Sequence, residues 1–86
     1  MTNYRIELRP AALRFLQQIR SQDRERIHGA IALLGSDPRP PKAIALSGRP
    51  GFRVRVGDYR IIYTIQDDIL LVAVVTLGHR RDEYDK

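Results

Sequence analysis

The segment from residue 52 to residue 65 constrains the fold of this chain more than any other part of its sequence. It reads FRVRVGDYRIIYTI, with an alternating run on either side of Gly57 and Asp58. A two-residue connection with glycine at its first position is typical of a β-hairpin closed by a type II′ turn. Such a turn fixes the register, so Val56 is expected opposite Tyr59 and Arg55 opposite Arg60.

Because side chains alternate across a strand, this register gives the hairpin two faces. Arg53, Arg55 and Arg60 share one face, where the direct pairing of like charges destabilises the sheet. An anion bound among the guanidinium groups would explain why they are kept. Alternatively the arginines splay into water, or Glu7 or an acidic loop neutralises them. The opposite face should lie on the core, and it carries Phe52, Val54, Val56, Tyr59, Ile61 and Tyr63.

The charge of the chain is concentrated around the same hairpin. Lys and Arg number 15 against 10 Asp and Glu, a formal net charge of +5. Between Arg39 and Arg60, six basic residues stand against Asp58 alone, which accounts for the whole excess. Thirteen of the basic residues are arginine, whose planar guanidinium makes bidentate contacts with phosphate. The segment therefore indicates a polyanion site; the alternative is a charged surface kept for solubility.

The remaining patterns predict an α+β fold. Residues 4–8 alternate as a short strand, and Pro10 suits the first turn of a helix reaching about residue 20. A second, antiparallel helix is expected next, capped by Ser21 and ended by Gly35.

A proline-rich loop over residues 35–42 leads into strands at 44–46, 52–56, 59–65 and 69–77. We expect residues 1–86 to form a single domain, because so short a chain has no room for two cores. In it, a small antiparallel sheet of about four strands carries the N-terminal two-helix hairpin on one face.

Several classes of protein are excluded by composition. The chain has no cysteine, which excludes disulfides and thiolate metal sites and fits a reducing cytoplasm. Two histidines are too few for a histidine zinc site without carboxylates, so we expect no metal and no other cofactor. His28, between core positions of the second helix, is expected to be structural. No signal peptide is visible, and the apolar run at 69–75 is far shorter than the roughly 20 residues of a membrane helix.

The chain ends LGHRRDEYDK, in which Gly78 is expected to end the last strand. His79 is the group there that titrates near neutrality, so it is either a proton-transfer group or a solvated loop histidine. Tyr84 either stacks on a base or acts at a phosphate oxygen, or it packs on the sheet edge.

The segment LSGRPGFRVRVGDYRIIYTI, the apolar strand after it and the ending LGHRRDEYD resemble the RelE/ParE superfamily, the toxins of bacterial type II toxin–antitoxin modules. The N-terminal strand and helix pair match as well, so the likeness covers nearly the whole chain. The ending is more similar to the RelE branch, whose members cleave mRNA in the ribosomal A site. The ParE branch poisons DNA gyrase instead.

The RelE likeness implies a metal-independent endoribonuclease in which a 2′-hydroxyl attacks the neighbouring phosphate. It places Arg53 and Arg55 at two basic strand positions that are often lysine in the family. Arg60 and Arg80 match phosphate contacts, and Tyr84 matches a nucleotide-stacking tyrosine. Further RNA or phosphate contacts are expected from Lys42, Arg49 and Arg81.

A neutral arginine is rare at pH 7, since the guanidinium group of this residue type loses its proton only in strong base. We therefore expect Arg53 and Arg55 to act by charge, with Tyr84, His79 or ribosomal RNA moving protons. The implied partners are the ribosome with its mRNA and an antitoxin whose acidic segment covers the basic strands. Operator DNA would be met only through the antitoxin complex, and the setting is cytoplasmic. Two other functions stay open: a gyrase-inhibiting toxin without nuclease activity, and a non-catalytic RNA-binding module.

Overall fold

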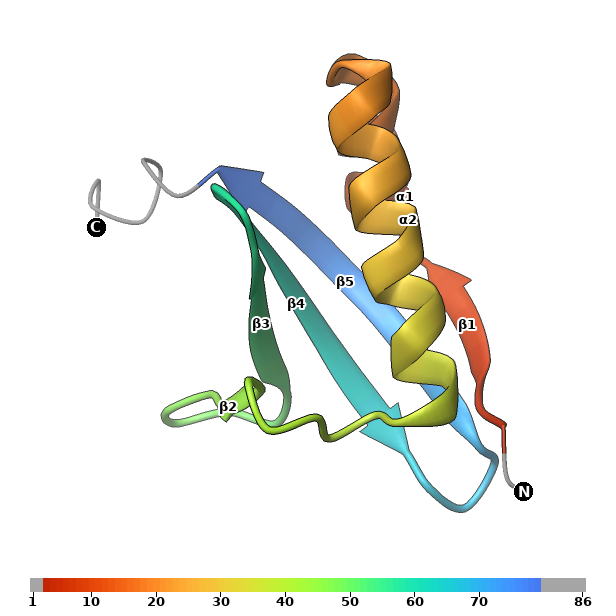
Figure 1. Ribbon diagram of the computed structural model, residues 1–86. Coiled ribbons are helices and arrows are strands. Elements are labelled where there is room, and N and C mark those ends of the chain that lie inside the picture. Colours follow the sequence, from red (N-terminus) through yellow and green to blue (C-terminus); the bar gives the residue numbers. More distant parts are fainter. Residues whose placement is uncertain (1–2, 80–86) are drawn as a thin grey trace.

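The computed structural model describes residues 3–79, which form a five-stranded sheet with two helices on one face (Figure 1). The strand order is β1-β5-β4-β3-β2. The α+β class and the one-sided helical layer are thus confirmed, with five strands in place of about four. In chain order the elements are β1 (Arg5–Leu8), α1 (Pro10–Gln18), α2 (Ser21–Ser36), β2 (Ile44–Ala45), β3 (Phe52–Val56), β4 (Tyr59–Gln66) and β5 (Leu71–His79).

The sheet is mixed, which corrects the expectation of an antiparallel one. β1 runs parallel to β5, with Arg5 opposite Leu71 and Leu8 opposite Val74. Both helices and three further strands separate the two elements in the chain, so no tight turn imposes an antiparallel pairing. β1 therefore closes one edge of the sheet, and the two-residue β2 closes the other.

The two helices follow each other after a short break, and their ends differ from those expected. Ser21 is the first residue of α2 and makes no capping hydrogen bond, since Arg20 occupies the N-cap position. Arg24 joins the helices instead: its Nε and Nη2 donate to the carbonyls of Leu16 and Ile19 at 2.7 and 2.9 Å. These carbonyls are left without intrahelical partners at the C-terminal end of α1, so the cation stabilises that end.

Gly35 lies inside the last turn of α2 rather than ending the helix, which continues to Ser36. It is buried against β1, where the Tyr4 N–H donates to its carbonyl at 2.7 Å. A Cβ at this position would lie 3.2 Å from the Tyr4 carbonyl oxygen. Close packing of the helix on the edge strand, rather than a C-cap, accounts for this glycine.

The hairpin expected at residues 52–65 is confirmed in register and in turn geometry. Val56 pairs with Tyr59 and Arg55 with Arg60, and Gly57 has a φ of 60°, the left-handed value that a type II′ turn needs at its first central position. The apolar face lies on the core as predicted. Val54, Ile61 and Tyr63 are buried there with Val72, Val74 and Leu77 of β5 and with Ala12, Leu16, Ile27, Ile31 and Leu34 of the helices.

β5 begins and ends two residues later than the predicted strand at 69–77. Ile69 and Leu70 form an exposed turn instead, and Leu70 takes a positive φ of 52°. At the other end, Gly78 does not end the strand: it pairs with Arg60, and His79 pairs with Tyr59. A bulge between Ile62 and Tyr63 shifts the β4–β5 register.

This bulge decides which face each residue at the end of β5 occupies. Tyr63 pairs with Val74 on one side of the bulge and Ile62 pairs with Thr76 on the other, so Val75 is the extra residue. An extra residue reverses the alternation of side chains beyond it. Leu77 and His79 therefore point toward the helices, and Gly78 lies on the opposite face beside Arg60.

No helix within residues 3–79 is both long and apolar enough to cross a membrane.

Candidate functional site

The sheet surface opposite the helices carries a cluster of cationic side chains. Lys42, Arg53, Arg55 and Arg60, here called the basic face, line a hollow of about 320 Å³ together with Ile44 and Val54. Lys42 comes from the loop before β2, and the three arginines come from β3 and β4. The structure thus brings together four of the candidate residues predicted from the sequence.

The hairpin sets the spacing of this cluster. Arg55 and Arg60 are directly opposite each other, which places their Cβ atoms about 4.5–5.5 Å apart. Arg53 lies two positions from Arg55, about 6.6 Å along the same strand. Because β4 is held between β3 and β5, the positions of the arginine Cα atoms are fixed by the ladder and not by a loop. The backbone positions of the three arginines are therefore fixed by the sheet, and their long side chains extend from it.

Neutralisation of this cluster by Glu7, one of the alternatives left open above, does not occur. Glu7 lies in β1, opposite Ala73, whereas Arg60 is opposite Gly78. β1 is separated from β4 by β5, a distance of about 10 Å at the usual strand spacing. The carboxylate of Glu7 instead lies 3.9 Å from Nε of Arg9.

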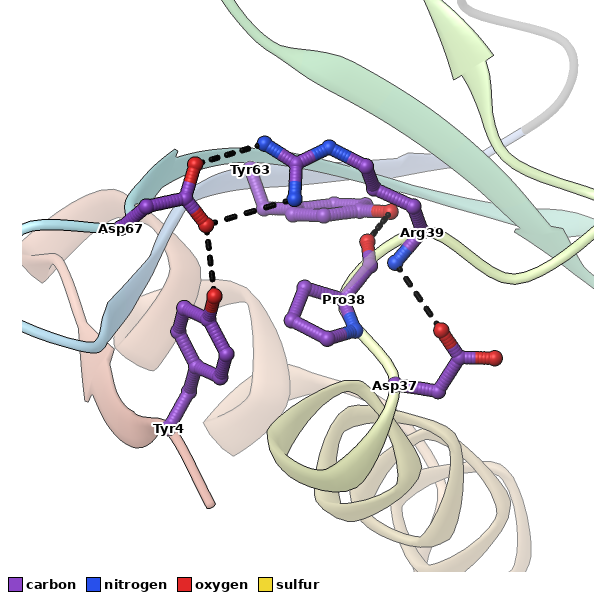
Figure 2. Close-up of polar contacts among 6 residues, drawn as sticks. All are labelled: Tyr4, Asp37, Pro38, Arg39, Tyr63 and Asp67. Carbon is purple, nitrogen blue, oxygen red and sulfur yellow. Dashed lines mark hydrogen bonds and ion pairs between the residues drawn. The ribbon is translucent and has the colours of Figure 1, made fainter. Parts of the chain in front are cut away.

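Arg39 belongs to the basic segment of the sequence but not to the basic face. Figure 2 shows its guanidinium against the carboxylate of Asp67, with Nη2 to Oδ2 at 2.8 Å and Nη1 to Oδ1 at 3.3 Å. The hydroxyl of Tyr4 donates to Oδ1 of the same carboxylate at 2.5 Å. The hydrogen bonds from Arg39 and then from Tyr4 lower the pKa of Asp67. We call Tyr4, Arg39 and Asp67 the Asp67 clamp.

The clamp ties the proline-rich loop to the far end of the sheet. The Arg39 guanidinium also lies 5.7 Å from the centre of the Phe52 ring, and the buried Tyr63 hydroxyl donates to the Pro38 carbonyl at 2.8 Å (Figure 2). Burial raises the pKa of Tyr63 to about 12. These contacts hold the segment that leads to Lys42, and so they fix the position of the Lys42 backbone beside the hollow.

His79 lies on the other face of the sheet from the basic face. Its ring meets the ring of Tyr59 edge-on, with centres 5.3 Å apart, and Phe15 of α1 packs on the same tyrosine at 5.9 Å. The Tyr59 hydroxyl donates to Oδ2 of Asp23 at 2.9 Å, and this hydrogen bond raises the pKa of Tyr59. The structure therefore places His79 against aromatic side chains, on the face of the sheet opposite Arg53, Arg55 and Arg60.

The other candidate residues lie apart from the hollow or outside the described part of the chain. Arg49 is exposed in the loop between β2 and β3 and does not line the hollow. His28 is exposed on α2, which corrects its expected structural role. Within residues 3–79, no group of three or more His, Cys, Asp or Glu side chains could hold a metal ion. Arg80, Arg81 and Tyr84 fall outside the described residues.

Two features of this region were missed at the level of sequence. Ile44 forms an apolar wall of the hollow because β2 pairs it with Arg53, and no local pattern set that pairing across the loop from residue 46 to residue 51. The bond between Arg39 and Asp67 joins residues 28 positions apart. The pair of acidic residues at 67 and 68, next to a strand end, was the available signal.

Comparison with known proteins places the chain in a family. Residues 6–84 match a family described as "ParE toxin of type II toxin-antitoxin system, parDE". The chain belongs to this family. The protein is thus a toxin of a type II toxin–antitoxin system, and the RelE/ParE superfamily indicated by its sequence is confirmed. No curated protein sequence gives a significant match.

Solved structures support the RelE-like fold. The chain is similar to one in the RelBE2 toxin–antitoxin complex of Mycobacterium tuberculosis, with a TM-score of 0.82 and 24% identity over 93% of this chain and 94% of the other. For the RelE–RelB complex of Pyrococcus horikoshii, the TM-score is 0.78 and the identity 22%, over 92% of this chain and 97% of the other. For the intact RelBE complex of E. coli, the TM-score is 0.78 and the identity 23%, over 88% of this chain and 95% of the other. At these identities the likeness establishes the fold alone.

Proposed function

We propose that this toxin is an mRNA endoribonuclease that acts on message held in the ribosomal A site and so stops translation. The observation that carries the proposal is the basic face: three arginines and a lysine around one hollow on a rigid sheet. A sugar–phosphate backbone is the ligand that such a cluster suits, because guanidinium groups bind phosphate in bidentate fashion.

The reaction proposed is transesterification within the RNA. The 2′-oxygen of one nucleotide forms a bond to the adjacent phosphorus, and the bond from phosphorus to the 5′-oxygen of the next nucleotide breaks. The products are a 2′,3′-cyclic phosphate and a free 5′-hydroxyl. Negative charge builds on the phosphate oxygens in the transition state, where Arg53, Arg55 and Arg60 stabilise it electrostatically.

Proton transfer needs groups other than these arginines, because arginine as a residue type keeps its positive charge in proteins. We assign a further phosphate contact to Arg80 and propose that Tyr84 stacks on the nucleotide and moves a proton, with ribosomal RNA as the other proton-transfer group. His79 is the weakest of these candidates because its ring packs on Tyr59, on the helix side of the sheet. The ribosome supplies the in-line geometry by holding the message.

The partner proposed for the resting state is a cognate antitoxin. The M. tuberculosis, P. horikoshii and E. coli structures are toxin–antitoxin complexes, and the basic face of this chain suits an acidic antitoxin segment. Such a complex would weaken as salt screens the contacts. Operator DNA would be reached only through the antitoxin.

A second function is favoured by the family match. That family is described by its ParE toxins, and the ParE branch poisons DNA gyrase. For this chain, a gyrase poison would damage DNA and leave mRNA intact. A binding module without catalysis would leave growth normal.

Cleavage of ribosome-bound mRNA in vitro, with the new 5′ ends mapped, tests the proposal. Wild type is expected to give ends in register with codons, Tyr84→Phe to give far fewer, and His79→Ala to cut at close to the wild-type rate. Intact message with gyrase-dependent DNA breaks would establish the second function instead.

A further inference from the structure

Gly78 is a glycine that neither the backbone nor the packing of the described chain requires. Its φ is not among the positive values, which belong to Gly48, Gly51 and Gly57. A Cβ built on Gly78 meets no atom of the described residues within 4 Å. A glycine inside a strand normally weakens the strand, and it often marks a place where a ligand or another backbone approaches closely.

The position of Gly78 indicates where that approach occurs. It pairs with Arg60 across the β4–β5 ladder, which places its Cα about 5 Å from that of Arg60 on the same face of the sheet. β1 stops at Leu8, opposite Val74, so no described strand flanks β5 at Gly78 on its other side. Among residues 3–79, no side chain therefore covers the backbone at Gly78, which lies beside Arg60 and next to the margin of the sheet.

We propose that Gly78 keeps the sheet bare beside Arg60 so that the sugar–phosphate backbone of the bound RNA lies directly against β5. This inference rests on the proposed function and deepens it, because it gives the RNA a path from the hollow of the basic face across Arg60 to Gly78. The bulge at Val75 contributes to this arrangement, because it sets which face of the sheet position 78 occupies. Without the extra residue, the alternation would turn position 78 toward the helices and place His79 next to Arg60.

The same geometry predicts that side chains at position 78 act on activity and on stability in opposite directions. A methyl group there displaces the ligand by about an ångström, a misplacement that can cost roughly 100-fold in rate. The fold gains instead, because alanine and especially valine suit a strand better than glycine. Gly78 is thus a positioning residue, and Gly78→Val should be less active than Gly78→Ala although it is at least as stable.

The test uses wild type, Gly78→Ala, Gly78→Val and the control Gly29→Ala. Gly29 is the matched position, because it is exposed on α2 and a Cβ there also meets nothing within 4 Å. For each protein, thermal unfolding, growth arrest on induction and cleavage of ribosome-bound mRNA are measured. We expect Gly29→Ala to match wild type in activity. Gly78→Ala should unfold at the wild-type temperature or above it, yet lose at least tenfold in both growth arrest and cleavage.

Full activity of Gly78→Ala would overturn the proposal, and so would failure of that variant to fold, since the glycine would then serve the chain itself. If wild type arrests growth without cutting mRNA, the proposed endoribonuclease is wrong, and the growth assay alone decides whether a ligand lies on Gly78. A wild type that does neither would overturn both.

Discussion

The two ends of β4 use arginine in different ways. Beyond its C-terminal end, Arg39 is bonded through two nitrogens to Asp67, and the carboxylate also accepts from Tyr4. At its N-terminal end, Arg60 is opposite Arg55, with Arg53 and Lys42 around the same hollow. Arg60 and Asp67 are separated along the strand by about 23 Å. At one end a carboxylate holds a single arginine, and at the other end four cationic side chains line one hollow.

We propose that the arginine held by Asp67 serves the fold and that the arginines gathered around the hollow serve a ligand. The sequence places all of them in one basic segment, from residue 39 to residue 60, and the fold sends them to opposite ends of the sheet. Total charge therefore does not separate Arg39 from the arginines around the hollow, whereas the cross-strand pairing of Arg55 with Arg60 does. Such pairing weakens the sheet, so its presence suggests a binding role.

The largest loss of toxicity is expected when Arg60 of the basic face or Arg80 of the C-terminal segment is removed. Arg60→Ala and Arg80→Ala should each abolish toxicity, with cleavage falling by about 100–1,000-fold, as when a group that stabilises transition-state charge is lost. Arg14→Ala, which alters an exposed arginine of α1, is the control and should remain toxic. Growth arrest at wild-type strength by the double variant Arg60→Ala/Arg80→Ala would show that the site lies elsewhere.

The salt dependence of RNA binding should also distinguish the two ends. Four cationic side chains that contact single-stranded RNA predict a slope of log K against log salt of about −3. Each cation that is lost should reduce the magnitude of this slope by about 0.7. Arg55→Gln is expected to show that reduction, measured with a 2′-O-methyl oligonucleotide that cannot be cleaved. Arg39→Gln should leave the slope unchanged. Equal slopes for both variants would remove the distinction between the two arginines.

Stability should respond to the same two substitutions with opposite signs. Arg55→Gln relieves the like-charge contact with Arg60 and should raise the free energy of unfolding by a few tenths of a kcal/mol up to about 1 kcal/mol. Arg39→Gln breaks the Asp67 clamp and should lower the melting temperature by a few degrees. Thermal and urea unfolding of both variants measure this. A lower stability for Arg55→Gln would mean that the arginine serves the fold.

The clamp end should also respond to alkaline pH through Tyr63. Its folded pKa of about 12 lies above the ordinary value near 10, so its stabilising contribution is complete below about pH 10 and is lost as the pH rises toward 12. Tyr63→Phe should cost about 1 kcal/mol at pH 8, through the lost hydrogen bond to Pro38. Urea unfolding at pH 8 and pH 11 should show this difference shrinking. A constant difference would contradict the assignment.

The parts of the structure that local patterns determine were predictable. The hairpin register followed from the turn at Gly57, and the separation of its apolar and cationic faces followed from alternation. The helix pair and the one-sided core also followed from periodicity. In each case the interacting residues are close in sequence or follow the spacing of a single helix or strand.

The parts that depend on distant pairing were not predictable. The parallel pairing of β1 with β5 and the bond from Arg39 to Asp67 both join residues far apart in the chain. The Val75 bulge has no signal of its own in a run of apolar residues, yet it decides that Gly78 and not His79 lies beside Arg60. The extra residue Val75 therefore altered which side chains lie beside Arg60, whereas the misplaced ends of helices and strands did not.

The most direct test of the central claim is a residue-resolved map of RNA binding. Amide NMR shifts would be recorded for wild type as an uncleavable 2′-O-methyl RNA oligonucleotide is added at low salt. We predict shifts at Arg53, Arg55, Arg60 and Gly78, with the amides of Tyr4, Arg39 and Asp67 unmoved. Shifts at the Asp67 clamp with none on the basic face would contradict the claim that the gathered arginines bind RNA.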